Sequence, residues 1–152
     1  MSYLRATRLL CWLLGVAFVV SVVHYLDNYV SYDEYPQPAD DATVPAPSAG
    51  VIGGAWFVFT ALGGLGLLMW FRRHITTAAV LLTGYSLSGL IGIGHYTVPG
   101  ATDMVWWRQT HVVVDIVLGA AVLGFALWAA RHSSELIPPA ARSAQQAPQP
   151  GA

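Results

Sequence analysis

Three histidines and two aspartates are spaced along the sequence in a way that could support acid–base or metal chemistry. His24 precedes Asp27 by three residues, His111 precedes Asp115 by four, and His95 lies in a segment between the two pairs. Residues three or four apart share one face of a helix, so each pair would place an imidazole beside a carboxylate. A carboxylate fixes the tautomer of the imidazole and raises its basicity in metal sites, proton relays and structural pairs alike.

Further polar residues continue these faces. Asn28 follows His24 by four residues, and Arg108 precedes His111 by three, so we assign both as supporting polar residues. Before His95, a stripe of small or polar residues recurs at separations of three, four and three: Tyr85, Ser88, Gly92 and His95. Three separate segments therefore each lead to a histidine.

The segments that must position these residues are strongly apolar. Hydrophobic residues make up 55% of the chain and charged residues 10%, against about 25% charged in a typical soluble domain. Four apolar segments cover about 9–26, 51–71, 76–96 and 107–130. Each reaches the ~20 residues that cross a hydrocarbon core, and none alternates as a barrel strand does. The sequence predicts an all-α integral membrane protein with four transmembrane helices.

The basic residues predict how these helices are oriented. Six of the seven arginines fall in one set of flanking segments, Arg5, Arg8, Arg72, Arg73, Arg131 and Arg142, and Arg108 falls in the other. By the positive-inside rule, we expect an up-down-up-down bundle with the N- and C-termini in the cytoplasm. The loop 27–50 carries five acidic residues and no basic one, so it would face outward. Tyr25, Tyr29 and Tyr32 recur at separations of four and three, which indicates that the first helix continues past the hydrocarbon core, with an aromatic face at the outer interface, and ends before Pro36.

One domain accounts for most of the chain. Residues 1–137 are expected to form the four-helix transmembrane domain, and the low-complexity segment 138–152 a disordered cytoplasmic tail. The absence of lysine beside seven arginines suggests a GC-rich bacterial genome, hence a multi-pass protein of the bacterial plasma membrane. The lipid bilayer is then the expected partner, and no nucleic acid is expected.

Small residues recur on two of the predicted helices. Gly84, Ser88 and Gly92 are spaced four apart, as are Ala120 and Gly124. Small residues at this spacing let a neighbouring helix approach closely, either within the chain or in a homo-oligomer.

Depth distinguishes Asp115 from the other polar residues. At 1.5 Å per residue from Trp107, it would lie about 12 Å inside the hydrocarbon core. An ionised aspartate at the centre of a lone helix costs roughly 2.5–3.5 kcal/mol, so it must face inward and find a partner. His111, one helical turn nearer the outer surface, is its nearest predicted partner.

Three interpretations remain open, and the first is structural. Polar residues hydrogen-bond helices together in lipid at about 0.6 kcal/mol each, and the cluster would then hold together a structural or accessory membrane protein.

The second interpretation is a metal site within the membrane. Five side chains offer ligands suited to zinc or another transition metal: His24, Asp27, His95, His111 and Asp115. Water on zinc has a pKa near ~7 and could hydrolyse the ester or amide of a lipid substrate, with Asp27 or Asp115 as catalytic candidates. No dense motif such as HExxH accompanies them.

The third interpretation is a redox or proton-handling protein. Two of the three histidines could ligate haem b from different helices, with a quinone as partner. Transport and signalling also remain open, since no residue pattern specifies either.

Overall fold

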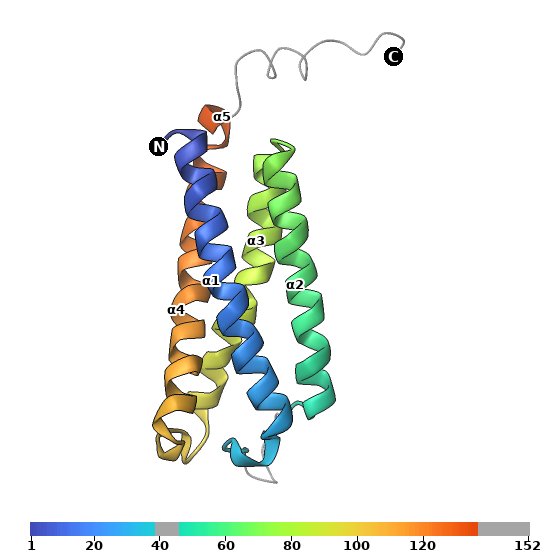
Figure 1. Cartoon of the computed structure of the whole chain (residues 1–152), viewed down its shortest axis with the longest axis vertical. Helices are drawn as coiled ribbons and strands as arrows, with labels where there is room; N and C mark the ends of the chain where they lie inside the picture. The colour runs from blue at the N-terminus through green and yellow to red at the C-terminus, as the bar shows by residue number, and fades with distance from the viewer. Residues whose placement is uncertain (39–45, 137–152) are drawn as a thin grey trace.

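The chain folds into a bundle of helices in the computed structural model, which describes residues 1–38 and 46–136. The long helices are α1 (Tyr3–Val30), α2 (Ala49–Phe71), α3 (Ile75–Leu90) and α4 (Trp106–Arg131) (Figure 1). Shorter helical turns are η1 (Tyr32–Glu34), η2 (Ile91–Thr97), η3 (Ala101–Asp103) and α5 (Ser133–Leu136). No strand occurs in the described ranges. The predicted tail 138–152 lies outside them.

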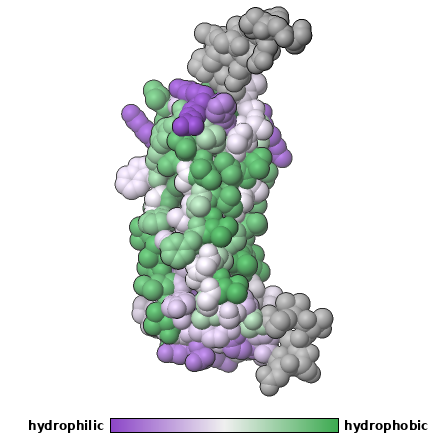
Figure 2. Space-filling view, turned by 90° about the vertical axis from the view of Figure 1, so that its right-hand side faces the viewer, coloured by the Kyte–Doolittle hydropathy of each residue, from purple (hydrophilic) through white to green (hydrophobic). Residues whose placement is uncertain are grey.

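The helices have the length and surface of membrane spans. α1, α2, α3 continued by η2, and α4 give four helices long and apolar enough to cross a membrane, which confirms that part of the prediction. Large apolar side chains such as Trp12 and Phe57 point away from the bundle. In Figure 2 the hydrophobic surface occupies the middle of the molecule, and hydrophilic residues gather towards its two ends.

The helix ends differ from the predicted boundaries. α1 continues to Val30, beyond the apolar segment 9–26, so Asp27 and Asn28 lie on the same helix as His24, as their spacing predicts. The apolar pattern stops at the first charge, but backbone hydrogen bonding continues for another turn. α3 ends at Leu90 and tightens into η2, because glycines at 92 and 94 are weak helix formers and Val98 is extended before Pro99.

Each helix packs against two others. α3 packs against α2 and α4, and α1 packs against the same two helices. Near the start of α1 the core is apolar, with Leu10, Trp70, Leu82 and Val122 fully buried. Trp70 also donates a 2.8 Å hydrogen bond to the hydroxyl of Thr7, which ties α2 to α1.

The closest backbone approach is between α3 and α4. A Cβ atom on Gly89 would overlap the carbonyl group of Asp115, and one on Gly119 would lie 2.8 Å from the carbonyl oxygen of Ser86. Because neither glycine has a side chain, α4 can hold Asp115 directly against α3. Gly119 was not among the predicted close-packing positions.

The predicted small-residue positions have mixed outcomes. Cβ atoms on Gly84 and Gly92 would lie 3.0 Å from Leu62 and 3.2 Å from Ile116, so both face a neighbouring helix as expected. Ala120 and Gly124 are exposed, and a Cβ atom on Gly124 would meet nothing within 4 Å. The prediction of close packing at these two positions is wrong within the chain, because the buried face of α4 passes through Gly119 instead.

We expect Gly89→Ala and Gly119→Ala each to destabilise the bundle by about 1–3 kcal/mol through overpacking. Gly124→Ala is the matched control, because its new methyl group meets open space and improves helix propensity. The measurement is the midpoint of thermal unfolding in detergent micelles, followed by circular dichroism. Equal midpoints for all three variants would contradict the close crossing.

Candidate functional site

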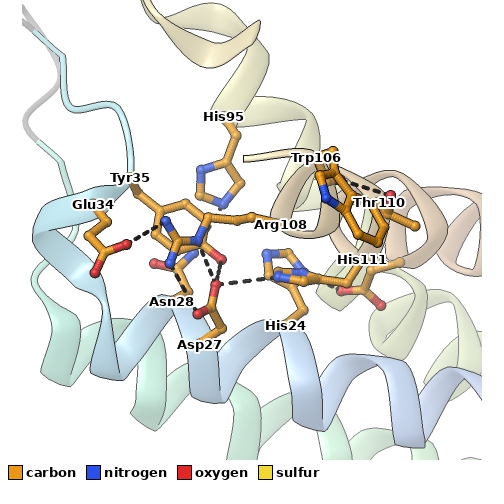
Figure 3. Close-up of polar contacts among 11 residues, drawn as sticks. His24, Asp27, Asn28, Glu34, Tyr35, His95, Trp106, Arg108, Thr110 and His111 are labelled. Carbon is orange, nitrogen blue, oxygen red and sulfur yellow. Dashed lines mark hydrogen bonds and ion pairs between the residues drawn. The ribbon is translucent and has the colours of Figure 1, made fainter. Parts of the chain in front are cut away.

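The polar residues of α1, η2 and α4 meet in one cluster (Figure 3). Contacts join all seven residues that the sequence singled out: His24, Asp27, Asn28, His95, Arg108, His111 and Asp115. The ring centroid of His24 lies 5.7 Å from that of His95 and 5.4 Å from that of His111, so His24 is central. The His24 ring therefore neighbours the rings of both other histidines.

The most deeply buried contact pairs His24 with Asp115. Nδ1 of His24 lies 2.7 Å from Oδ2 of Asp115, and both side chains are 3% exposed. The predicted partner of Asp115 was His111, on its own helix. That pairing is wrong, because α1 brings the ring of His24 to the carboxylate across the helix interface. The Asp115 carboxylate accepts the Nδ1 proton, which leaves Nε2 of His24 as the atom able to accept another.

A second group of contacts surrounds Asp27. Its carboxylate accepts hydrogen bonds from Nε of Arg108 at 2.8 Å, from a terminal guanidinium nitrogen at 3.3 Å, and from the Tyr35 hydroxyl at 2.5 Å. Arg108 also donates to Glu34 at 3.0 Å. The guanidinium is therefore paired with two carboxylates although its side chain is only 4% exposed.

Tyr35, in the segment after α1, contacts both Asp27 and Arg108. Its side chain is buried, and the guanidinium of Arg108 lies 4.9 Å from its ring centroid. Burial raises the pKa of the Tyr35 hydroxyl, and the hydrogen bond to Asp27 raises it further. The hydroxyl therefore keeps its proton and donates it to the carboxylate.

His111 lies between the two groups. Its Nε2 is 3.3 Å from Oδ2 of Asp27, a distance at which opposite charges attract, but the atoms are not aligned as a hydrogen bond. Both ring nitrogens are sealed from solvent and have no hydrogen-bond partner among the described residues. A buried polar atom without a partner reduces the stability of the fold by about 1–3 kcal/mol. His111 therefore has nitrogens that could still form hydrogen bonds.

His95 comes from η2 and faces the end of α1. Nδ2 of Asn28 donates to Nε2 of His95 at 3.0 Å, and the His95 ring lies 5.0 Å from that of Tyr35. The glycines that interrupt α3 allow this turn, which carries the histidine back towards α1. Asn28 is buried and thus positions His95.

A cavity of about 580 Å³ opens beside the cluster, within the usual range of ~300–1,000 Å³ for ligand pockets. Its polar lining includes His24, Asn28 and His95. Its apolar wall includes Val51, Ile52, Ala55, Ile91 and Val98. His24 lines this cavity, and its Nε2 has no protein hydrogen bond in the described ranges.

Sequence reasoning missed two members of the cluster. Glu34 and Tyr35 were assigned to the outward loop and the interface, but they contact Arg108 and Asp27. The available signal was the Tyr35–Pro36 step, because a residue before proline is held extended and ends the preceding turn. That step returns the Tyr35 ring to the bundle.

No three His, Cys, Asp or Glu side chains in residues 1–38 and 46–136 are arranged to hold a metal ion. Asp115 engages Nδ1 of His24, and Asn28 engages Nε2 of His95, so these nitrogens do not face a common point. Binding of zinc, another transition metal or haem b stays a prediction.

Comparisons with protein-family models, curated proteins and solved structures found no match.

We expect Asp27→Ala to destabilise the protein by about 3–5 kcal/mol, because it leaves the buried Arg108 guanidinium without its main partner. Glu34→Gln is the matched control on the same arginine, since the Glu34 side chain is 68% exposed and such pairs contribute only about 0–1 kcal/mol. Unfolding midpoints in detergent measure both effects. A loss at Glu34 equal to that at Asp27 would show that the buried pair does not dominate.

Proposed function

We propose that the protein binds a hydrophobic molecule with a polar end in the cavity, and that His24, oriented by Asp115, exchanges a proton with that polar end. One observation carries this proposal. Nδ1 of His24 is held by a buried carboxylate while Nε2 is free on the wall of a cavity of about 580 Å³.

The chemistry follows from this arrangement. A carboxylate that fixes the imidazole tautomer and stabilises the imidazolium lets Nε2 act first as base and then as acid. Positioned groups of this kind contribute typically about 10²–10⁴-fold to a reaction rate. With a lipid ester or amide, Nε2 takes a proton from water as its oxygen attacks the carbonyl carbon, and returns a proton to the leaving oxygen or nitrogen. With a ligand that carries an acidic C–H bond, Nε2 removes the proton from carbon and returns it without hydrolysis.

The purely structural interpretation explains less of the site. A cluster that served only to hold helices together would have no use for an adjacent cavity, and would gain by satisfying its polar atoms. Here the charged pairs are satisfied, but Nε2 of His24 and both nitrogens of His111 have no hydrogen bond within the described residues. A structural or accessory role remains the alternative outcome of the experiment below.

The surroundings support a lipid as the ligand class. Four membrane-spanning helices and an apolar cavity wall favour a molecule that dissolves in the bilayer. We also propose the up-down-up-down arrangement with cytoplasmic termini, in the bacterial plasma membrane. Support comes from the arginine distribution, which leaves Arg108 on the side of the cavity and would place the site in the outer half of the bilayer.

Isotope incorporation tests the proposed chemistry without a known substrate. The protein would be reconstituted in vesicles made from a bacterial membrane lipid extract, in D₂O or in H₂¹⁸O, and the lipids analysed by mass spectrometry. We expect deuterium on carbon for proton transfer, or ¹⁸O in a released acid for hydrolysis. His24→Gln should lower incorporation by about 10²-fold or more, since Gln cannot exchange the proton.

Two further variants complete this experiment. Asp115→Asn should reduce incorporation less than His24→Gln, because it perturbs the orientation of the ring but leaves Nε2 in place. His74→Gln is the control, an exposed histidine at the start of α3 outside the site. If the wild type incorporates no isotope above the His24→Gln variant, the proposed catalysis is wrong and the accessory role is favoured.

Cysteine labelling tests the proposed orientation. In a Cys11→Ala background, Thr102→Cys would introduce an exposed thiol beside α4, and Ser134→Cys one on α5. A membrane-impermeant maleimide added to intact cells should label the first thiol, and the second only after lysis. The reverse pattern would put the site in the cytoplasmic half.

A further inference from the structure

A second hollow lies between α1 and α2. It has a volume of about 460 Å³, and glycine, aliphatic and aromatic residues line it: Val22, Tyr25, Leu26, Tyr29, Gly50, Gly53, Gly54, Trp56 and Phe57. Leu26 is 59% exposed and Phe57 69% exposed, so the hollow opens on the outer surface of the bundle. Within a membrane-spanning region, that surface faces lipid.

Tyr25 connects this hollow with the cavity at His24. Its side chain lines both spaces, and its hydroxyl donates a 3.0 Å hydrogen bond to the carbonyl oxygen of Ser88 on α3. The two spaces therefore adjoin at one buried aromatic ring. Tyr25 thus lies between the hollow and the cavity that His24 lines.

Glycines on α2 form the floor of the hollow. A Cβ atom on Gly53 would lie 3.2 Å from the Tyr29 ring, and one on Gly54 would meet nothing within 4 Å. A side chain at 54 would therefore occupy space that no protein atom fills.

We infer that the hollow between α1 and α2 holds the hydrocarbon chain of a lipid whose polar end lies in the cavity at His24. This inference rests on the proposed function and names its ligand class, a lipid with an extended chain drawn sideways from the bilayer. Its lining offers no charged side chain for a polar group, whereas the adjoining cavity offers His24, Asn28 and His95. The apolar chain therefore matches the hollow, and the polar end matches the cavity at His24, because an unpaired polar group in hydrocarbon is costly.

Photolabelling of the reconstituted protein tests this inference. The vesicles would contain phosphatidylglycerol with a photoactivatable diazirine in one acyl chain, and the labelled residues would be mapped by mass spectrometry. We expect label concentrated on the residues of the hollow, above all Val22, Leu26 and Phe57, rather than spread over all lipid-facing residues.

Two glycine variants sharpen the test. Gly54→Leu should fill the hollow without displacing protein atoms and lower its labelling at least threefold. Gly64→Leu is the matched control, since Gly64 lies on the same helix, is exposed, and would also meet nothing within 4 Å. Uniform labelling around the bundle, or equal labelling in both variants, would show ordinary boundary lipid and overturn the inference.

The failure of this inference can be distinguished from failure of the proposed function. If Gly54→Leu changes neither labelling nor isotope incorporation while His24→Gln abolishes incorporation, the chain site is wrong and the proton transfer stands. If labelling depends on Gly54 but the wild type incorporates no isotope, the chain site stands and the proposed catalysis falls.

Discussion

The pairing of Asp115 with His24 is the constraint on which the arrangement of the helices depends. An ionised carboxylate in the middle of an apolar span costs several kcal/mol unless another group compensates it. The partner comes from α1, and on the other side Gly89 and Gly119 let α3 and α4 approach until their backbones touch beside Asp115. The closest helix crossing therefore lies beside Asp115, the side chain that is most costly to bury.

The sequence predicted the fold and the members of the cluster for the same physical reason. Water is absent from the hydrocarbon core, so charged and imidazole side chains are rare there, and each one stands out against the apolar background. Six such residues and Asn28 were identified from the sequence, and the structure brings them together. Helix number follows from the length needed to cross the bilayer.

The pairings could not be predicted in the same way. Spacing within α4 places His111 beside Asp115 on one face, but the rotation of α1 decides which imidazole reaches the carboxylate, and that rotation depends on packing among all four helices. Tyr35 and Glu34 were missed because they follow the apolar run. Their positions depend on a turn before Pro36, and the cavity depends on which side chains leave space unfilled.

The cluster contains polar groups that are hydrogen-bonded and imidazole nitrogens that are not. The bonded groups stabilise the fold, and the unbonded nitrogens are the candidates for reactivity. Asp27, Arg108 and Asp115 are charged or acidic and are each paired, so they hold α1 to α4. Among the described residues of the cluster, the unbonded atoms include imidazole nitrogens, namely Nε2 of His24 and both nitrogens of His111. An imidazole is the side chain that gains and loses a proton most readily near neutral pH. The Asp115 carboxylate thus fixes the position of His24, whose Nε2 is the atom that the proposed ligand would meet.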